Sequence, residues 1–121
     1  VTSLGKPDWV CEKVHQVGGF VYHDIINRLW AQKGQDCGVD GLICVNNRAG
    51  GHLGNDSMEN MYNDLHDLGL PLICAGGIGS ENELSEAIDT FNTCGIVVST
   101  PTELETAELF FGIPKFPARS L

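Results

Sequence analysis

Short apolar runs alternate along this chain with longer amphipathic segments, and this alternation limits the folds that the chain can adopt. The clearest run, Leu42 to Val45, is rich in β-forming residues and is bounded by Gly41 and Asn46. It is too short for a helix and reads as a buried parallel strand. Such runs, separated by helical segments of about ten residues, indicate βαβ units. The sequence therefore predicts an α/β fold with a parallel sheet.

The same patterns predict where each element begins and ends. Pro7 suits a first helical turn, and the glycines at 18–19 and at 69 suit helix ends. Ser80 and Glu83 form a capping box, in which Ser80 caps a helix and Glu83 reaches back to its start. We expect strands over 1–3, 20–23, 42–45, 70–75 and 95–98, and helices over 6–16, 25–33, 57–68 and 80–91.

Composition and charge narrow the class of protein and of partner. The chain has 121 residues, of which 42% are hydrophobic, so we expect one globular domain over 1–121. A net charge of −9 with only 7 lysines and arginines argues against a nucleic acid or an anionic membrane as partner. We see no apolar span of about 18 residues and no signal peptide, which predicts a cytoplasmic protein.

The cysteines are odd in number and carry no metal-binding pattern. There is no C-x-x-C motif, and no histidine stands at metal-ligand spacing from any of them. We therefore expect five reduced thiols, no disulfide framework and no metal site; the cysteines are Cys11, Cys37, Cys44, Cys74 and Cys94.

A glycine-rich loop after the run at 42–45 presents a single imidazole. His52 lies between the pair Gly50-Gly51 and Gly54, so the backbone beside the ring has almost no side-chain bulk. A flat ligand could approach the ring closely, which would suit a catalytic or binding role. The alternative is a solvated histidine on a flexible surface loop, and the residues alone weigh both equally.

A second glycine-rich turn follows the run at 70–75. Gly76 and Gly77 precede the predicted helix start, where converging N–H groups and the helix dipole attract a phosphate. Ser99 and Thr100 end the next run and could form the other wall of this anion site. The alternatives are an ordinary turn for the glycines and a helix cap for Ser99-Thr100. Ligands of parallel α/β folds do lie beyond the carboxyl ends of the strands.

Taken together, these motifs resemble a known family. The motifs at 38–43, 49–54 (A-G-G-H-L-G), 70–78 (ending A-G-G-I) and 95–100 occur in an order that is similar to the C-terminal half of FMN-dependent TIM-barrel enzymes. That family includes nitronate monooxygenases, formerly called 2-nitropropane dioxygenases, and flavin-type enoyl-acyl-carrier-protein reductases. Order and spacing agree over about 1–108, while the tail at 109–121 has no counterpart.

The resemblance implies a partial (β/α)8 barrel containing about strands four to eight, with FMN as cofactor. It implies that His52 lies beside the flavin as catalytic base, and that Gly50 and Gly51 let the backbone approach the cofactor. The phosphate would be held by Gly76 and Gly77 after the seventh strand and by Ser99 and Thr100, where the family has Gly-Thr. The chain departs from the family at four positions: Val45 and Val97 replace a common glutamine, Ser99 replaces a glycine, and Pro101 follows the threonine.

The activity that the resemblance implies is oxidation of a nitronate or nitroalkane with O2. One alternative is an enoyl-thioester reductase that uses a nicotinamide through FMN. The other is a non-catalytic interaction module built from half of the barrel.

The length of the chain raises a question of completeness. The family barrel has eight strands, whereas this chain offers about five. It could be a fragment of a longer enzyme, a half-barrel that dimerises, or a remnant. Unpaired sheet edges invite pairing, so we expect self-association or a requirement for an N-terminal half-barrel. We also expect Val45, Cys74 and Val97 to line the open side of the barrel.

Overall fold

The computed structural model describes residues 1–3, 5–50, 52–91 and 95–97. Its helices are α1 (Asp8–Gln16), α2 (Arg28–Asp36), α3 (Met58–Leu65), the short 3-10 helix η1 (His66–Leu68) and α4 (Glu81–Phe91). Its strands are β1 (Tyr22–Ile25), β2 (Gly41–Val45), β3 (Leu72–Ala75) and β4 (Gly95–Val97). No helix in this part of the chain is long and apolar enough to cross a lipid bilayer.

The sheet is parallel, and its strand order is the order of the chain. β1 pairs with β2, β2 with β3 and β3 with β4. Thr2 continues the series on the free side of β1, where its N–H donates to the Tyr22 carbonyl over 2.9 Å and its carbonyl accepts from Asp24 N–H over 2.8 Å. The short strand predicted at 1–3 is therefore present as a single bridge.

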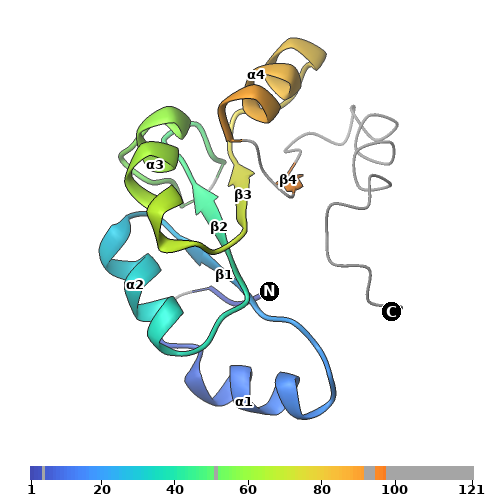
Figure 1. Cartoon of the computed structure of the whole chain (residues 1–121). Coiled ribbons are helices and arrows are strands. Elements are labelled where there is room, and N and C mark those ends of the chain that lie inside the picture. Colours follow the sequence, from blue (N-terminus) through green and yellow to red (C-terminus); the bar gives the residue numbers. More distant parts are fainter. Residues whose placement is uncertain (4, 51, 92–94, 98–121) are drawn as a thin grey trace.

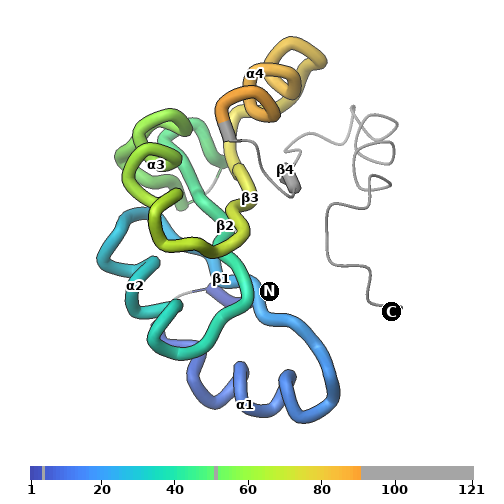
Figure 2. Tube along the Cα trace, in the orientation of Figure 1, coloured from blue at the N-terminus to red at the C-terminus, as the bar shows by residue number. Residues whose placement is uncertain are grey.

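The helices that connect successive strands lie on one side of the sheet. Figure 1 shows α2 and α3 side by side on the same face of β1 and β2. The trace in Figure 2 passes from β1 through α2 to β2, and from β2 through α3 to β3. A doubly wound sheet reverses its strand order and carries helices on both faces, whereas a barrel wall does neither. The arrangement is that of a segment of a (β/α)8 barrel.

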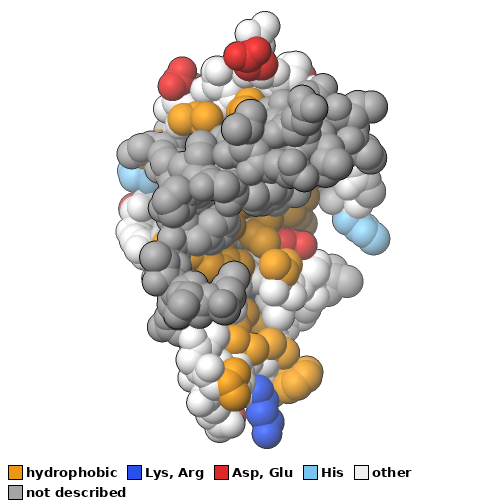
Figure 3. Space-filling view, turned by 90° about the vertical axis from the view of Figure 1, so that its right-hand side faces the viewer, with side chains coloured by type: hydrophobic (Ala, Val, Ile, Leu, Met, Phe, Trp, Pro, Cys, Tyr) orange, Lys and Arg blue, Asp and Glu red, His pale blue; other side chains and the backbone are white. Residues whose placement is uncertain are grey.

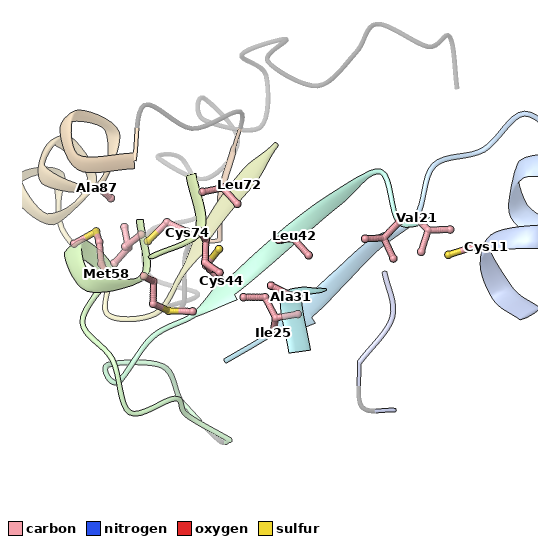
Figure 4. Close-up of a cluster of buried hydrophobic side chains, with 14 residues drawn as sticks. Cys11, Val21, Ile25, Ala31, Leu42, Cys44, Met58, Leu72, Cys74 and Ala87 are labelled. Atoms are coloured by element: carbon pink, nitrogen blue, oxygen red, sulfur yellow. The ribbon is translucent and has the colours of Figure 1, made fainter. Parts of the chain in front are cut away.

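The helix-facing side of the sheet forms the main core. Leu42 and Cys44 of β2, together with their register partners Leu72 and Cys74 of β3, are almost completely buried there. Figure 4 shows Cys44 and Cys74 near Met58 of α3. Leu42 packs instead against α2, where an added Cβ at Gly34 would lie 3.7 Å from its Cδ2. This contiguous apolar layer joins the strands to the helices.

The other face of the sheet would be the inside of a barrel. Tyr22, Ile43, Ile73 and Ala75 form a second buried cluster there, with Val45 packed against it. Figure 3 views the molecule from this side and shows hydrophobic side chains grouped on the part of the face that described residues form. Side chains alternate between the faces of a strand, so this set is offset by one residue from the main core.

This alternation corrects one expectation about the inner face. Val45 does lie on it, but Cys74 points to the helices, because it precedes the inward-facing Ala75 by one residue. The prediction for Cys74 was wrong, since it treated an apolar run as if all its members faced one way. The side chain of Val97 lies outside the described residues.

The second predicted strand and helix begin too early. We expected a strand over 20–23 and a helix from residue 25, whereas β1 covers Tyr22–Ile25 and α2 starts at Arg28. The cause is Asn27, whose extended backbone (φ −159°, ψ 175°) and side-chain oxygen, which accepts from Trp30 N–H over 3.1 Å, cap the helix.

Other boundaries shift less. Pro7 stands at the N-cap of α1 rather than within it, and Gly18 follows the helix end at a φ of +77°, as predicted. Ser57 caps α3 by accepting from Asn60 N–H over 3.2 Å. The predicted helix over 57–68 ends as a 3-10 turn, closed by Gly69 in the left-handed region (φ +75°).

The packing of the thiols predicts their reactivity. All four described cysteines are free, as expected, and Cys94 lies outside the described residues. Burial raises the pKa of Cys74 to about 12, and the thiolate is the reactive form. At pH 8 we expect iodoacetamide to modify Cys74 in the native protein roughly a thousandfold more slowly than an ordinary exposed thiol. Partly exposed Cys37 should react well before Cys11, Cys44 and Cys74.

Peptide mass spectrometry of samples quenched over time would measure these rates, with the denatured protein as the reference in which all four thiols become accessible. Equal rates for Cys37 and Cys74 in the native protein would contradict the packing of the strands on α3.

Candidate functional site

The loops that follow β2 and β3 meet at the carboxyl ends of these strands. Parallel α/β sheets place their ligands there, because successive loops converge at that edge. The loop after β2 carries His52, and the turn after β3 carries Gly76 and Gly77.

Backbone hydrogen bonds close the loop after β2 at its base. The carbonyl of Asn46 accepts from Gly54 N–H over 3.2 Å, and Asn47 N–H donates to the carbonyl of Asp56 over 2.9 Å. A Cβ at Gly54 would collide with the carbonyl of Val45. A glycine is therefore required where the end of the loop packs against the end of β2. His52 is therefore presented near the tip of a loop whose ends are fixed. No hydrogen bond from the described part of the chain holds its exposed ring.

A buried asparagine joins this loop to the next one. Asn46 is only 1% exposed. Its side-chain Nδ2 donates to the carbonyl of Gly76 over 3.1 Å, and its Oδ1 accepts from Arg48 N–H over 2.8 Å. Its backbone N–H donates to the carbonyl of Ala75 over 3.0 Å. These bonds satisfy a polar group that would be costly to bury alone, and they fix the distance between the two loops.

Both glycines after β3 are required by this contact. Gly76 has a φ of +127° and Gly77 a φ of +69°, conformations that L-residues with a side chain rarely adopt. A Cβ at Gly76 would collide with Oδ1 of Asn46 and come within 2.7 Å of Ala49 N, and one at Gly77 would lie 2.6 Å from Cβ and Nε of Arg48. The turn thus accommodates its neighbouring loop, which is a reason for the two glycines that involves no ligand.

The capping box at the start of α4 is present with a changed partner. Ser80 Oγ accepts from Glu83 N–H over 3.3 Å, as predicted. The Glu83 carboxylate reaches back one residue further than expected, accepting from Gly79 N–H over 2.8 Å and pairing with Arg48 over 2.9 Å. The Gly79 amide, which an anion at this helix start could use, is therefore already occupied by a carboxylate.

Three of the predicted site residues line one cavity. This cavity of about 460 Å³ is bordered by Gly50, His52 and Gly76, and its floor includes Val45 and Ala75. Its size suits a small-molecule ligand. The predicted residue Gly77 is not among its lining residues, while Gly51, Ser99 and Thr100 lie outside the described residues.

Asp24 is a polar group of this cavity that the sequence analysis missed. It lies near the end of β1 opposite Ile43, on the inner face, and it lines the same cavity as His52. Burial raises the pKa of its carboxyl group, an effect that a hydrogen bond with Ser3 and the neighbouring His23 reduce. Alternation within β1 could have revealed it, because Asp24 stands two residues after the inward-facing Tyr22.

The described residues contain no metal centre. Across 1–3, 5–50, 52–91 and 95–97, no group of three histidine, cysteine or acidic side chains could hold a metal ion. The chemistry available at this cavity is that of an imidazole and a carboxyl group beside small and apolar residues.

No family model and no curated protein matches the sequence. Solved structures do match. A single-residue variant of FabK from Thermotoga maritima superposes with a TM-score of 0.74 and FabK itself with 0.73, each at 22% identity. Each alignment covers 85% of this chain, whereas this chain spans 35% and 33% of those two proteins. The likeness shows the fold, so the parallel sheet and its helices are a partial segment of a (β/α)8 barrel like that of FabK.

Proposed function

We propose that this chain is part of an FMN-dependent oxidoreductase that reduces the carbon–carbon double bond of an enoyl thioester. The observation that carries the proposal is the cavity at the carboxyl ends of the strands, where His52 stands over a floor of small residues. The choice of substrate is supported by the likeness to FabK, an FMN-dependent enoyl-acyl-carrier-protein reductase.

The residues around the cavity fit a flat ring. Gly50, Ala75 and Gly76 are small enough for a planar group to lie against the backbone, and Val45 adds an apolar surface. We assign the ring system of FMN to this surface and its phosphate to the turn at Gly76-Gly77, with Ser99 and Thr100 as further candidates. When bound, FMN would supply two-electron transfer between a nicotinamide and the substrate.

His52 would handle the proton in this reaction. Reduction places a hydride on the β-carbon of the thioester and a proton on its α-carbon, and the exposed imidazole at the cavity is positioned to donate that proton. The second candidate, nitronate oxidation with O2, uses the same residue in the reverse sense, because a neutral nitroalkane must first lose its α-proton. An imidazole suits both roles, so the substrate decides between them.

The test of the proposal is substitution of His52 followed by assays of both reactions. His52→Asn should retain the visible flavin spectrum while turnover falls by roughly 10²–10⁴-fold, because a positioned proton donor or base is lost. Reduction of a crotonyl thioester by NADH should be the reaction affected. If oxygen consumption with nitroalkanes is found instead, the loss should be large for the neutral nitroalkane and much smaller for the ionised nitronate.

His66→Asn is the matched control. His66 begins η1, before β3 and hence at the other end of the strands, so both activities should stay at the wild-type level. A wild-type protein that binds no added FMN and turns over neither substrate would contradict the proposal and favour a non-catalytic module.

The phosphate assignment is tested at Gly77. Gly77→Asp adds a side chain against Arg48 and a negative charge beside the proposed phosphate site, so FMN affinity should fall roughly tenfold or more. Gly77→Asn has the same bulk without the charge, and it separates like-charge repulsion from displacement of the turn. Gly69→Asp is the control, because Gly69 has a similar φ of +75° with no atom within 4 Å of an added Cβ, and it stands before β3. It should lower stability without changing the FMN dissociation constant. Equal dissociation constants for the two Asp variants, measured by flavin titration, would mean that the phosphate lies elsewhere.

We further propose that the inner face of the sheet is completed by another polypeptide segment. The cluster around Tyr22, Ile43 and Ile73 is the face that the rest of a barrel would cover. We expect the chain to associate with itself, or with a separately produced N-terminal half of FabK, and sedimentation over a range of concentrations would detect either. A concentration-independent monomer that binds FMN unaided would contradict this proposal.

A further inference from the structure

A second, smaller cavity adjoins the one that contains His52. It has a volume of about 280 Å³, and Ile26, Trp30 and Leu53 supply much of its apolar wall. Three residues, Asp24, Val45 and His52, line both cavities. The two cavities therefore lie next to each other at His52.

The smaller cavity is built by two loops that pack against each other. Ile26 follows β1, and Leu53 belongs to the closed loop after β2. The two loops meet at Gly54, where an added Cβ would lie 3.5 Å from Cβ of Ile26. Because the base of the loop after β2 is fixed by Asn46 and Gly54, this wall keeps its place beside His52.

The chemistry of the wall indicates what the cavity accepts. Ile26 is 37% exposed and Leu53 is 53% exposed, so large apolar side chains face water in this part of the molecule. Among the described residues that line the cavity there is no lysine or arginine. Its ionisable groups, His23, Asp24 and His52, leave the side formed by Ile26 and Leu53 apolar. An anionic ligand would find no lysine or arginine among these described residues, whereas an alkyl chain would remove apolar surface from water.

We propose that this smaller cavity binds the unbranched alkyl tail of the substrate, with the reacting carbon beside His52. This inference rests on the proposed function, since it assigns the part of the substrate that does not react. At about 280 Å³ the cavity is just below the usual range for ligand sites, roughly 300–1,000 Å³, which suits a short chain rather than a peptide segment.

Binding can be measured without any enzymatic activity. The chain has 2 tryptophans, and Trp30 lines the cavity, so in a Trp9→Phe background the fluorescence of Trp30 reports its occupancy. Straight-chain alcohols from ethanol to octanol are the probes. Their dissociation constants should fall roughly fourfold for each added methylene until the cavity is full, because each buried methylene contributes a constant increment.

Leu53→Asn should flatten this dependence on chain length, because it places an amide in the apolar wall, and Ile26→Asn should do the same from the other loop. Val17→Asn is the matched control: Val17 is 85% exposed after α1 and lines neither cavity, so the dependence should stay as in the Trp9→Phe protein. An unchanged dependence in both loop variants, or none in the Trp9→Phe protein, overturns the inference.

Turnover separates this inference from the proposed function. The values of kcat/KM for enoyl thioesters of increasing chain length should rise in the same proportion as alcohol affinity, and Leu53→Asn should remove that rise. If alcohol affinity rises with chain length as expected but no substrate is turned over, the proposed function is rejected and the alkyl site is supported. Turnover that depends on His52 but not on chain length would reject the alkyl site alone.

Discussion

The candidate site depends on one buried polar residue, Asn46. An asparagine with only 1% exposure is tolerable because its amide bonds to the turn after β3 and to its own loop. Those bonds determine how the loop carrying His52 lies against the turn carrying Gly76. The cavity between them is therefore a consequence of hydrogen bonds within the protein and exists before any ligand arrives.

The turn after β3 has to accommodate its neighbouring loop as well as any phosphate that binds there. Gly76 and Gly77 make room for Asn46 and Arg48, while the Glu83 carboxylate occupies the Gly79 amide and pairs with Arg48. An incoming phosphate meets a helix start that already holds a negative group. A cofactor bound here would rely on the remaining amides of the turn and on the apolar floor under its ring, so ring contacts would contribute a large part of its affinity.

The sequence was most informative where a signal is local. The run at 42–45 was placed correctly because β-rich composition and its flanking residues agree, and Ser57 and Gly69 mark the ends of their helical segment by chemistry that needs no distant partner. Asn27 was missed because an apolar Ile25-Ile26 pair beside it favoured an earlier helix start. Asn46 acts through the turn after β3, so its role becomes visible only when the sheet register is known, whereas alternation within β1 could have revealed Asp24. The direction of Cys74 was predicted wrongly because the apolar run at 70–75 was treated as if all its members faced one way.

The agreement between strand order and chain order has a consequence for how the molecule is made. Each of the described strands from β2 to β4 pairs with the strand just before it. During synthesis, each of these strands can therefore pair with an edge that has already left the ribosome. None of the four described strands has to be inserted between two that are already joined. Contacts of this kind keep sequence separations modest for a parallel sheet, which favours rapid, stepwise growth from the amino terminus. The newest edge is then also the one most open to pairing with a foreign strand while synthesis continues.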